Sequence, residues 1–191
     1  AAHYTVGGVK TDLTGRTNIP HLYVCGELAS SGIMGANRLA SNSLIECLVF
    51  GKRAVEDSVR NRREDPIPET MPLFSLDREK LDAYLSLKNK VADIMTQEAG
   101  IIRTENGLQE GLETLLRLEQ TEIFEENEYY SLVSKNLLTV AELIIRSALF
   151  RKESRGGHFR SDYPTPNDDY VCHIIQQKGK EIKTTPVILN N

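Results

Sequence analysis

Several features are missing from this sequence, and each absence excludes a class of protein. No apolar run approaches the roughly 18 residues that a membrane-spanning helix needs. The balance of 23 basic and 27 acidic residues gives a formal charge of −4, which argues against a broad nucleic-acid surface. The three cysteines, Cys25, Cys47 and Cys172, contain no Cys-x-x-Cys pair. We therefore expect a reduced, cytoplasmic protein without a disulfide framework or a metal site.

Two further absences concern the start of the chain. It opens on AAHYTVGG without an initiator methionine, and that opening is neither a signal peptide nor a transit peptide. No Gly-x-Gly-x-x-Gly motif follows a strand, so a dinucleotide pyrophosphate site of that kind is not encoded in these 191 residues. Because the first residues already resemble a strand, we expect the chain to be a fragment.

The segment from Gly32 to Leu48, GIMGANRLASNSLIECL, is the most informative stretch. Ser43 followed by Glu46 is a capping-box pattern, and it predicts a helix whose apolar stripe runs through positions 44, 45, 48, 49, 55 and 59. A glycine-rich approach to a helix N-terminus presents backbone donors to an anion, and Arg38 adds a planar fork that suits a carboxylate or phosphate. An ordinary loop entering an ordinary helix would show the same pattern.

Upstream of that segment the pattern favours short strands. DLTGR at 12–16 predicts a turn, so the segments on either side of it are expected to form a hairpin. Residues 22–25 are continuously apolar, which predicts a strand buried on both faces. Glu27 follows directly, and an acid just past the carboxyl end of a buried strand lies where open α/β sheets bind ligands. A lone glutamate in water is the simpler alternative.

The second part of the chain has helical periodicity. Residues 64–76 hold three of the seven prolines and predict a linker. Beyond it, apolar stripes predict three helices, from Ser75 or Asp77 to about Gly100, from about Gly107 to Glu126, and from about Tyr129 to Phe150. Helices of this length with short connections form an antiparallel bundle. We therefore divide the chain into a first part at 1–63, a linker at 64–76, a bundle at 77–150 and an extension at 151–191.

The extension begins with a basic loop, RKESRGGHFR at 151–160. For Arg155, His158 and Arg160 we favour structural docking onto a neighbouring domain over contact with a substrate. Residues 170–176 predict a strand, and residues 181–189 its hairpin partner across Lys178-Gly179-Lys180. The predicted fold class is α+β, a C-terminal piece of an α/β domain followed by a three-helix bundle and a short β-hairpin.

Four separated motifs in this order resemble the succinate dehydrogenase/fumarate reductase flavoprotein superfamily. The first pairs HYT at 3–5 with Gly7-Gly8, and the second runs from Thr17 through a short apolar strand to Gly26-Glu27. The third joins GANR at 35–38 to Ser43-Leu44, and the fourth contains ESRG at 153–156 with His158, Arg160 and DYP at 162–164. Within the superfamily, ASNSLIEC at 40–47 is similar to the branch that oxidises L-aspartate.

The resemblance implies an enzyme of NAD biosynthesis that uses FAD. It would oxidise L-aspartate to iminoaspartate by hydride transfer to flavin N5, with oxygen or fumarate reoxidising the flavin and the product passing to quinolinate synthase. By family motif, Arg38 and His3 bind the substrate carboxylates, Glu27 contacts the ribityl side of FAD, and Ser43 and Leu44 lie at the flavin ring. Because the pyrophosphate half is missing, we expect this fragment alone to hold FAD poorly and to be inactive.

Two alternatives remain open. The chain could come from a succinate dehydrogenase or fumarate reductase flavoprotein subunit, since the residues that sense the amino group of aspartate lie elsewhere. It could also be a helical interaction module with a strand-rich extension and no chemistry of its own.

Overall fold

The chain divides into two units, which we call the N-terminal unit (residues 1–67) and the helical unit (residues 68–191). The computed structural model describes residues 4–62 and 74–187, and each unit is described by itself. Most of the predicted linker at 64–76 lies outside the described residues. Its last part belongs to the helical unit, where Ser75 pairs with the segment before the third bundle helix by donating its N–H to the Asn127 carbonyl at 3.0 Å.

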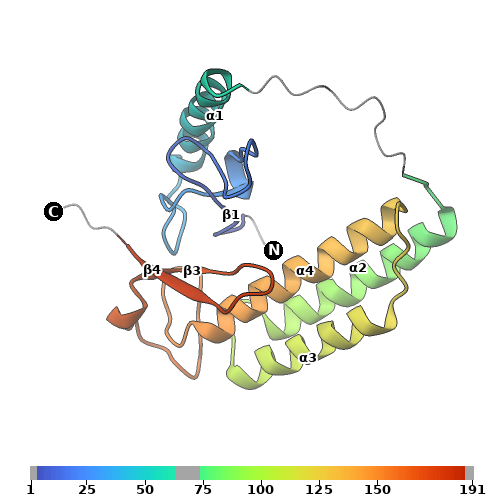
Figure 1. Ribbon diagram of the computed structural model, residues 1–191. Helices are drawn as coiled ribbons and strands as arrows, with labels where there is room; N and C mark the ends of the chain where they lie inside the picture. The colour runs from blue at the N-terminus through green and yellow to red at the C-terminus, as the bar shows by residue number, and fades with distance from the viewer. Residues whose placement is uncertain (1–3, 63–73, 188–191) are drawn as a thin grey trace. The chain divides into compact units, whose positions relative to one another are not determined.

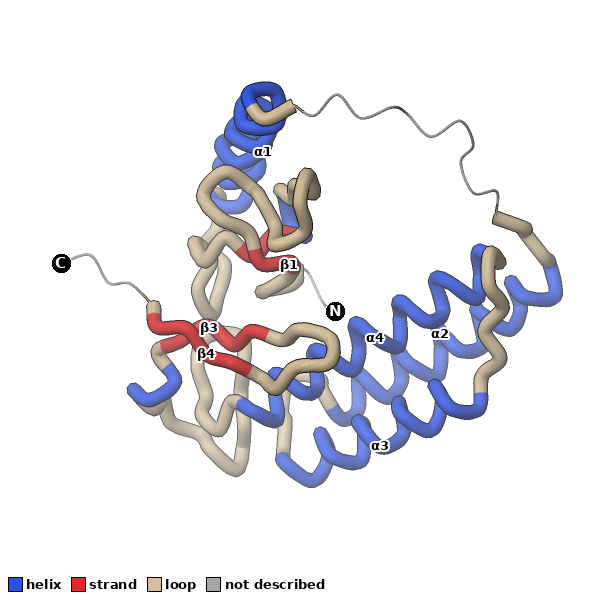
Figure 2. The backbone as a smooth tube through the Cα atoms, in the orientation of Figure 1, coloured by secondary structure: helices blue, strands red, loops and turns tan. Residues whose placement is uncertain are grey.

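The N-terminal unit is built from short elements around one long helix. In chain order they are β1 (Val9–Lys10), the 3-10 helix η1 (Gly26–Leu28), β2 (Ala29–Ser30) and α1 (Asn42–Arg60). β1 and β2 pair in parallel, with Val9 opposite Ala29. Figure 2 shows this strand pair among the loops of the unit. Gly8 lies at φ +150°, and a side chain there would meet the Leu28 carbonyl oxygen at 2.2 Å, so the close approach of the two segments requires glycine.

Two predictions for residues 12–25 need correction. The turn at 12–16 is present, because the Asp12 carboxylate accepts hydrogen bonds from the N–H groups of Thr14 and Arg16. The antiparallel contact, however, joins Arg16 to Tyr23 and does not flank that turn. Residues 22–25 are not a buried strand either, since Leu22 is 43% exposed. The backbone of Leu22 and Val24 is instead bonded to Thr17 and Gly15, through the Thr17 N–H at 3.0 Å and the Gly15 carbonyl at 2.8 Å.

Helix α1 also differs from the prediction. It begins at Asn42, its N-cap residue is Ser41 at φ +73°, and no side chain caps it. Glu46 does not complete a capping box with Ser43, because its carboxylate accepts a hydrogen bond from the Ser31 hydroxyl. The buried face of α1 contains Glu46, Phe50 and Ala54, whereas the predicted apolar stripe is exposed, with Leu48 at 75%. The small unit covers only the face that packs on η1 and on the turn at Gly15.

The helical unit contains the three predicted helices: α2 (Arg78–Glu98), α3 (Glu105–Thr121) and α4 (Tyr129–Phe150). They lie side by side in Figure 1. Each begins at a polar N-cap residue whose side chain accepts backbone N–H groups of the first turn: Asp77, Thr104 and Glu128. α3 begins two residues earlier and ends five residues earlier than predicted, because Thr104 is its cap and the backbone at Glu122 is extended.

The core of the bundle is made by one side of each helix. Its buried members are Leu87, Val91, Ala99, Leu108, Leu115, Leu138, Ala141, Ile145 and Ala148. Glycine allows α2 and α3 to approach closely, because a Cβ at Gly111 would meet Glu98 Cβ at 3.0 Å and Ile145 Cδ1 at 3.2 Å. The predicted bundle is therefore confirmed, and with it the α+β fold class.

A short hairpin follows the bundle. After the 3-10 helix η2 (Asp168–Tyr170), β3 (Cys172–Ile175) pairs antiparallel with β4 (Lys183–Pro186), with Cys172 opposite Pro186. The side-chain amide of Gln176 donates to the Leu143 carbonyl and to the Ser147 hydroxyl, each at 2.7 Å. These bonds attach the hairpin to the C-terminal half of α4, and the hairpin predicted from the sequence is confirmed.

Candidate functional site

The segment Tyr4–Thr5 contacts two of the predicted site residues. The Thr5 N–H donates to Glu27 Oε1 at 2.8 Å. The Tyr4 hydroxyl donates to Asn37 Oδ1 at 2.6 Å, and the Arg38 guanidinium carbon lies 4.1 Å from the centroid of the Tyr4 ring. Tyr4 and Thr5 thus connect Glu27, which lies in η1, to Arg38 of the glycine-rich loop. His3, the other predicted carboxylate-binding residue, lies outside the described residues.

The backbone of the loop that carries Arg38 is in the left-handed conformation at three residues. Gly32 and Gly35 have φ of +92° and +56°, and Ser41 has φ +73° directly before α1. Glycine adopts such angles without a steric penalty. The last of the three turns the chain into the helix, so that Ser43 is its second residue and is partly exposed, while the side chain of Leu44 is 73% exposed.

The N-terminus of α1 can donate backbone hydrogen bonds to an acceptor atom of a ligand. A helix leaves its first N–H groups without partners inside the helix, and a capping side chain normally accepts one of them. Ser41 makes no such bond. Backbone donors, the positive end of the helix dipole and the exposed apolar side chain of Leu44 therefore occur together at this point.

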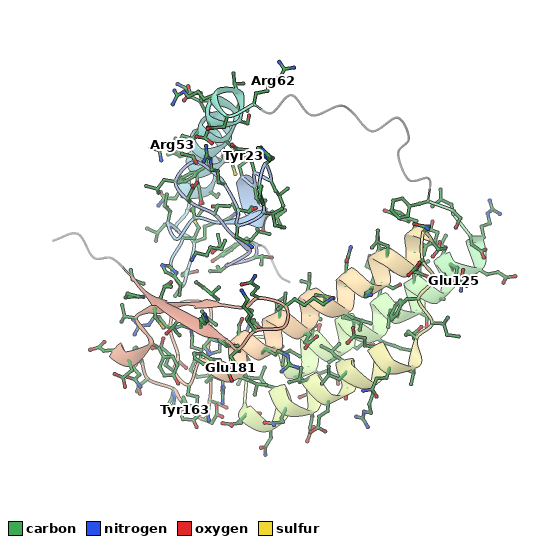
Figure 3. All side chains as sticks on the ribbon, viewed as in Figure 1. Tyr23, Arg53, Arg62, Glu125, Tyr163 and Glu181 are labelled. Carbon is green, nitrogen blue, oxygen red and sulfur yellow. The ribbon has the colours of Figure 1, made fainter. Side chains whose placement is uncertain are left out.

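A cavity of about 490 Å³ lies in another part of the N-terminal unit. It is lined by residues 16–23 together with Asn61 and Arg62, and none of the predicted site residues lines it. Two of its lining residues, Tyr23 and Arg62, are labelled in Figure 3. The Tyr23 hydroxyl donates to Asp57 at 2.8 Å, so this side chain already has a structural partner on α1.

The basic loop at 151–160 is fastened within the helical unit by a buried carboxylate. Glu153 is fully buried and accepts hydrogen bonds from Arg151, from Arg155 and from the Asn167 N–H at 2.8 Å. Burial tends to raise its pKa, but the hydrogen bonds outweigh burial and the pKa of Glu153 lies below its ordinary value. Arg151 also donates to the Cys172 carbonyl at 2.9 Å, which ties the end of α4 to β3.

Arg160 is also fully buried and joins the facing ends of α3 and α4. Its guanidinium donates to both oxygens of Asp162 at 2.7 and 2.6 Å and to the Ala148 carbonyl at 3.0 Å, near the end of α4. Asp162 in turn accepts the Glu105 N–H at the start of α3, at 2.9 Å. We call Arg160, Asp162, Glu105 and the Ala148 carbonyl the α3–α4 clamp. All these partners belong to the helical unit, and docking of Arg160 onto the N-terminal unit stays a prediction.

His158 is held between two further groups of the helical unit. Its Nδ1 lies 2.8 Å from Arg103 Nη1, and its Nε2 lies 3.1 Å from the Arg151 carbonyl oxygen. The arginine can only donate and the carbonyl can only accept, so the imidazole is neutral with its proton on Nε2. Burial, followed by the charges of neighbouring arginines, lowers the pKa of His158 to about 4. His158 thus has partners inside its own unit, as Arg155 has in Glu153.

This geometry predicts an acid-sensitive helical unit. Between pH 6.5 and about 4 the unfolded chain binds a proton at position 158 that the folded chain does not bind. Stability should therefore be complete above pH 6.5 and fall as the pH drops through this window, by about 3 kcal/mol at most. Urea unfolding of His158→Gln across this range should give a flatter profile than the natural chain. An unchanged slope in His158→Gln would contradict the assignment.

In residues 4–62 and 74–187, no group of three or more His, Cys, Asp or Glu side chains is arranged to hold a metal ion. None of the helices in these ranges has both the length and the hydropathy of a membrane-spanning segment. All three cysteines are free thiols.

Two protein-family models match this chain. The family model "Fumarate reductase flavoprotein C-term" matches residues 88–191, which is more than half of the chain, and the model "FAD binding domain" matches residues 1–44. The chain belongs to the fumarate reductase flavoprotein family. The superfamily indicated by the four motifs is thereby confirmed, and FAD is the cofactor that the match to residues 1–44 supports.

Relatives within the family are L-aspartate oxidases. That of Nostoc sp. is 38% identical over 93% of this chain and 36% of its own length, and that of Pseudomonas aeruginosa is 40% identical over 86% of this chain and 32% of its own length. The chain thus spans about a third of these relatives.

Solved structures of the family have the same fold. The FrdA chain of E. coli quinol fumarate reductase matches 99% of this chain and 37% of its own length, with a TM-score of 0.77 and 27% identity. Mycobacterium smegmatis Sdh1 matches 97% of this chain and 35% of its own length, with a TM-score of 0.70 and 27% identity.

No function could be predicted for Tyr4 from the sequence, although this residue contacts both Asn37 and Arg38. Its only signal is its place beside His3 in the HYT motif. The α3–α4 clamp was not predicted from the sequence either. Its signal is the pair Arg160 and Asp162, an arginine and a carboxylate two residues apart in a loop that follows a long helix.

Proposed function

We propose that this chain is part of an FAD-dependent oxidase that converts L-aspartate to iminoaspartate in the quinolinate branch of NAD biosynthesis. The observation that carries the proposal is the contact of Tyr4–Thr5 with Glu27 on one side and Asn37–Arg38 on the other. This contact links the Glu27 carboxylate, which can accept hydrogen bonds from sugar hydroxyls, to the Arg38 guanidinium, which can bind a substrate carboxylate. The identity of 38–40% with L-aspartate oxidases supports the choice of substrate.

The residues present fit FAD. Glu27 uses one oxygen for the Thr5 N–H, and a carboxylate with about four lone-pair positions can accept ribityl hydroxyls as well. The uncapped first turn of α1 at Ser43 and Leu44 offers backbone donors and positive dipole to the carbonyl edge of a flavin ring. Leu44 adds exposed apolar surface against which the ring can pack.

FAD, when bound, supplies the acceptor for the hydride of the substrate. The work of the chain's own residues is to bind and orient the dicarboxylate. Arg38 holds one carboxylate through its planar fork. His3 adds a hydrogen bond or a charge to a carboxylate. Because the substrate Cα must lie against the flavin, fixing its carboxylates lowers the entropic part of the barrier.

The remaining parts of the proposal concern the whole enzyme. Oxygen or fumarate reoxidises the flavin, quinolinate synthase receives the product, and the protein acts in the cytoplasm. Residues 1–63 form the end of the FAD-binding domain and residues 77–150 its helical neighbour. Residues 151–191 are the C-terminal extension that follows the bundle.

A second candidate is a succinate dehydrogenase or fumarate reductase flavoprotein. It is favoured by the match of 99% of this chain to the E. coli quinol fumarate reductase flavoprotein chain. A non-catalytic helical module is disfavoured by the FAD-binding match at residues 1–44. The full-length protein with FAD, kept free of oxygen, distinguishes the two enzymes by the loss of oxidised-flavin absorbance. L-Aspartate should reduce the flavin, and reduction by succinate with none by L-aspartate would reject our proposal.

Replacing Glu27 with alanine should weaken FAD binding in the full-length enzyme. The ribityl hydroxyls lose a charged acceptor, which corresponds to about 1.5–3 kcal/mol or roughly a 10- to 150-fold higher Kd. Flavin content after dialysis, measured by absorbance, tests this. Glu56→Ala is the matched control, because Glu56 lies on α1 and pairs with the exposed Lys52 at 3.7 Å. Equal flavin retention in the two variants would remove Glu27 from the site.

A further inference from the structure

We propose that Tyr4 is a positioning residue that holds Arg38 in the orientation needed to bind a substrate carboxylate. The inference rests on the proposed function, in which Arg38 is the carboxylate-binding group. Tyr4 itself touches neither the substrate nor the reacting atoms in this proposal. It acts through Arg38 and through Asn37, the residue directly before it.

The first contact is between the Tyr4 ring and the Arg38 guanidinium, whose central carbon lies 4.1 Å from the ring centroid. A cation within about 6 Å of an aromatic face is attracted by the negative charge of the π system. A guanidinium carries five N–H donors, and a carboxylate is bound by two of them. Tyr4 can therefore support Arg38 without competing with the substrate.

The second contact fixes the loop beneath the arginine. The Tyr4 hydroxyl donates to Asn37 Oδ1 at 2.6 Å across 33 residues of sequence. The loop's own backbone hydrogen bonds are long, since Gly35 to Gly32 and Asn37 to Met34 are both 3.3 Å. A glycine-rich loop of this kind has many accessible conformations, so a bond from a distant segment limits where the Arg38 backbone can lie.

The third observation concerns the neighbouring residue. The Thr5 N–H binds Glu27 at 2.8 Å, so one short segment contacts both the proposed cofactor side and the proposed substrate side. Anchoring both sides to adjacent residues gives Arg38 a defined position relative to Glu27. A binding group held in its productive position loses less entropy when the ligand arrives. Tyr4 should thus contribute to ligand affinity through pre-organisation of Arg38.

The test uses the full-length enzyme with FAD and malonate, a dicarboxylate that cannot be dehydrogenated between its carboxylates. Malonate affinity is measured by titrating the absorbance of the oxidised flavin, which does not depend on turnover. Tyr4→Leu should weaken malonate binding about tenfold, because it removes the ring and the hydroxyl. Tyr4→Phe keeps the ring and should weaken it about two- to threefold. Tyr23→Leu, which removes a tyrosine bound to Asp57 in the same unit, should leave the Kd unchanged.

The deciding measurement is a double-mutant cycle with Arg38. If Tyr4 acts through Arg38, then Tyr4→Leu placed in an Arg38→Leu background should change the Kd for malonate by less than about twofold. The same tenfold loss in both backgrounds would overturn the inference, as would a loss that follows loss of flavin. Should Tyr4→Leu fail to fold, the same cycle is run with Tyr4→Phe and Asn37→Ala, and additive effects of Tyr4→Phe and Arg38→Leu would again overturn it.

The outcome also separates this inference from the proposed function. Normal malonate binding in Arg38→Leu would reject the role of Arg38 and the function built on it. Weak binding in Arg38→Leu with normal binding in Tyr4→Leu would leave the function standing and reject only the positioning role.

Discussion

Replacing Arg38 with leucine should lower kcat/KM of the full-length enzyme for its dicarboxylate substrate at least about a hundredfold. This corresponds to roughly 2.7 kcal/mol of lost transition-state stabilisation. The substrate carboxylate would face a site whose charged, bidentate partner is missing. Arg38→Lys should already be severe, because the ammonium keeps the charge but not the planar fork. Steady-state kinetics with L-aspartate measures both variants.

Flavin content is the control for this prediction. Glu27, Ser43 and Leu44 are unchanged in both Arg38 variants, so FAD occupancy should stay near that of the natural enzyme. Near-normal turnover in Arg38→Leu would remove the residue from the site. A loss of activity in proportion to a loss of flavin would instead make Arg38 part of the cofactor site.

Replacing Arg160 with methionine should lower the free energy of unfolding of the helical unit by about 3–5 kcal/mol. The guanidinium is fully buried. Methionine fills part of its volume but cannot bind Asp162 or the Ala148 carbonyl, so a carboxylate and a helix carbonyl lose their partner. The hydrogen bonds from Arg160 lower the pKa of Asp162 to about 2, and this stabilisation, complete above the unfolded pKa near 3.8, is lost as the pH falls toward 2.

Arg146→Met is the matched control for Arg160→Met. Arg146 lies on α4 and pairs with Glu142 one turn away at 2.6 Å, but its side chain is 41% exposed. Exposed pairs of this spacing contribute about 0.3–0.5 kcal/mol. Urea unfolding followed by circular dichroism of the helices should therefore separate the two variants clearly. Equal, small losses in both would show that the clamp does not stabilise the unit.

The helices of the bundle could be predicted because their signals are local. Asp77 is a polar residue at a predicted helix start and does cap α2, and the apolar spacing at 129–150 gives the bounds of α4. The end of α3 was predicted too late because residues 122–126 contain neither glycine nor proline. Where a helix lacks a local stop signal, packing decides its last residue.

The N-terminal unit was predicted less well because its apolar residues are not where its small core lies. The apolar stripe of α1 and the apolar segment 22–25 carry the residue types of buried elements, yet Leu44, Leu48 and Leu22 are exposed. Ser43 and Glu46 match a capping box, but the hydroxyl of the half-buried Ser31 donates to the Glu46 carboxylate instead. A side chain with two possible partners cannot be assigned from spacing alone.

The candidate site was partly accessible from sequence. Motif resemblance indicated Glu27 and Arg38, and the structure brings both against Tyr4–Thr5. It could not indicate that Tyr4 contacts Asn37 and Arg38, because the contact with Asn37 spans 33 residues and leaves no periodic trace. The neutral form of His158 was equally hidden, since it depends on Arg103, which is 55 residues away.

These long separations have a consequence for folding kinetics. The clamp and the His158 contact join the start of α3 to the loop at 158–162 across 55 to 57 residues, so α3 and α4 must both be in place before these bonds can form. Contacts made after the folding transition state affect the unfolding rate more than the folding rate. We therefore expect Arg160→Met to fold almost as fast as the natural chain and to unfold much faster. The clamp would then determine how long the helical unit stays folded, and the packing of the three helices how quickly it forms.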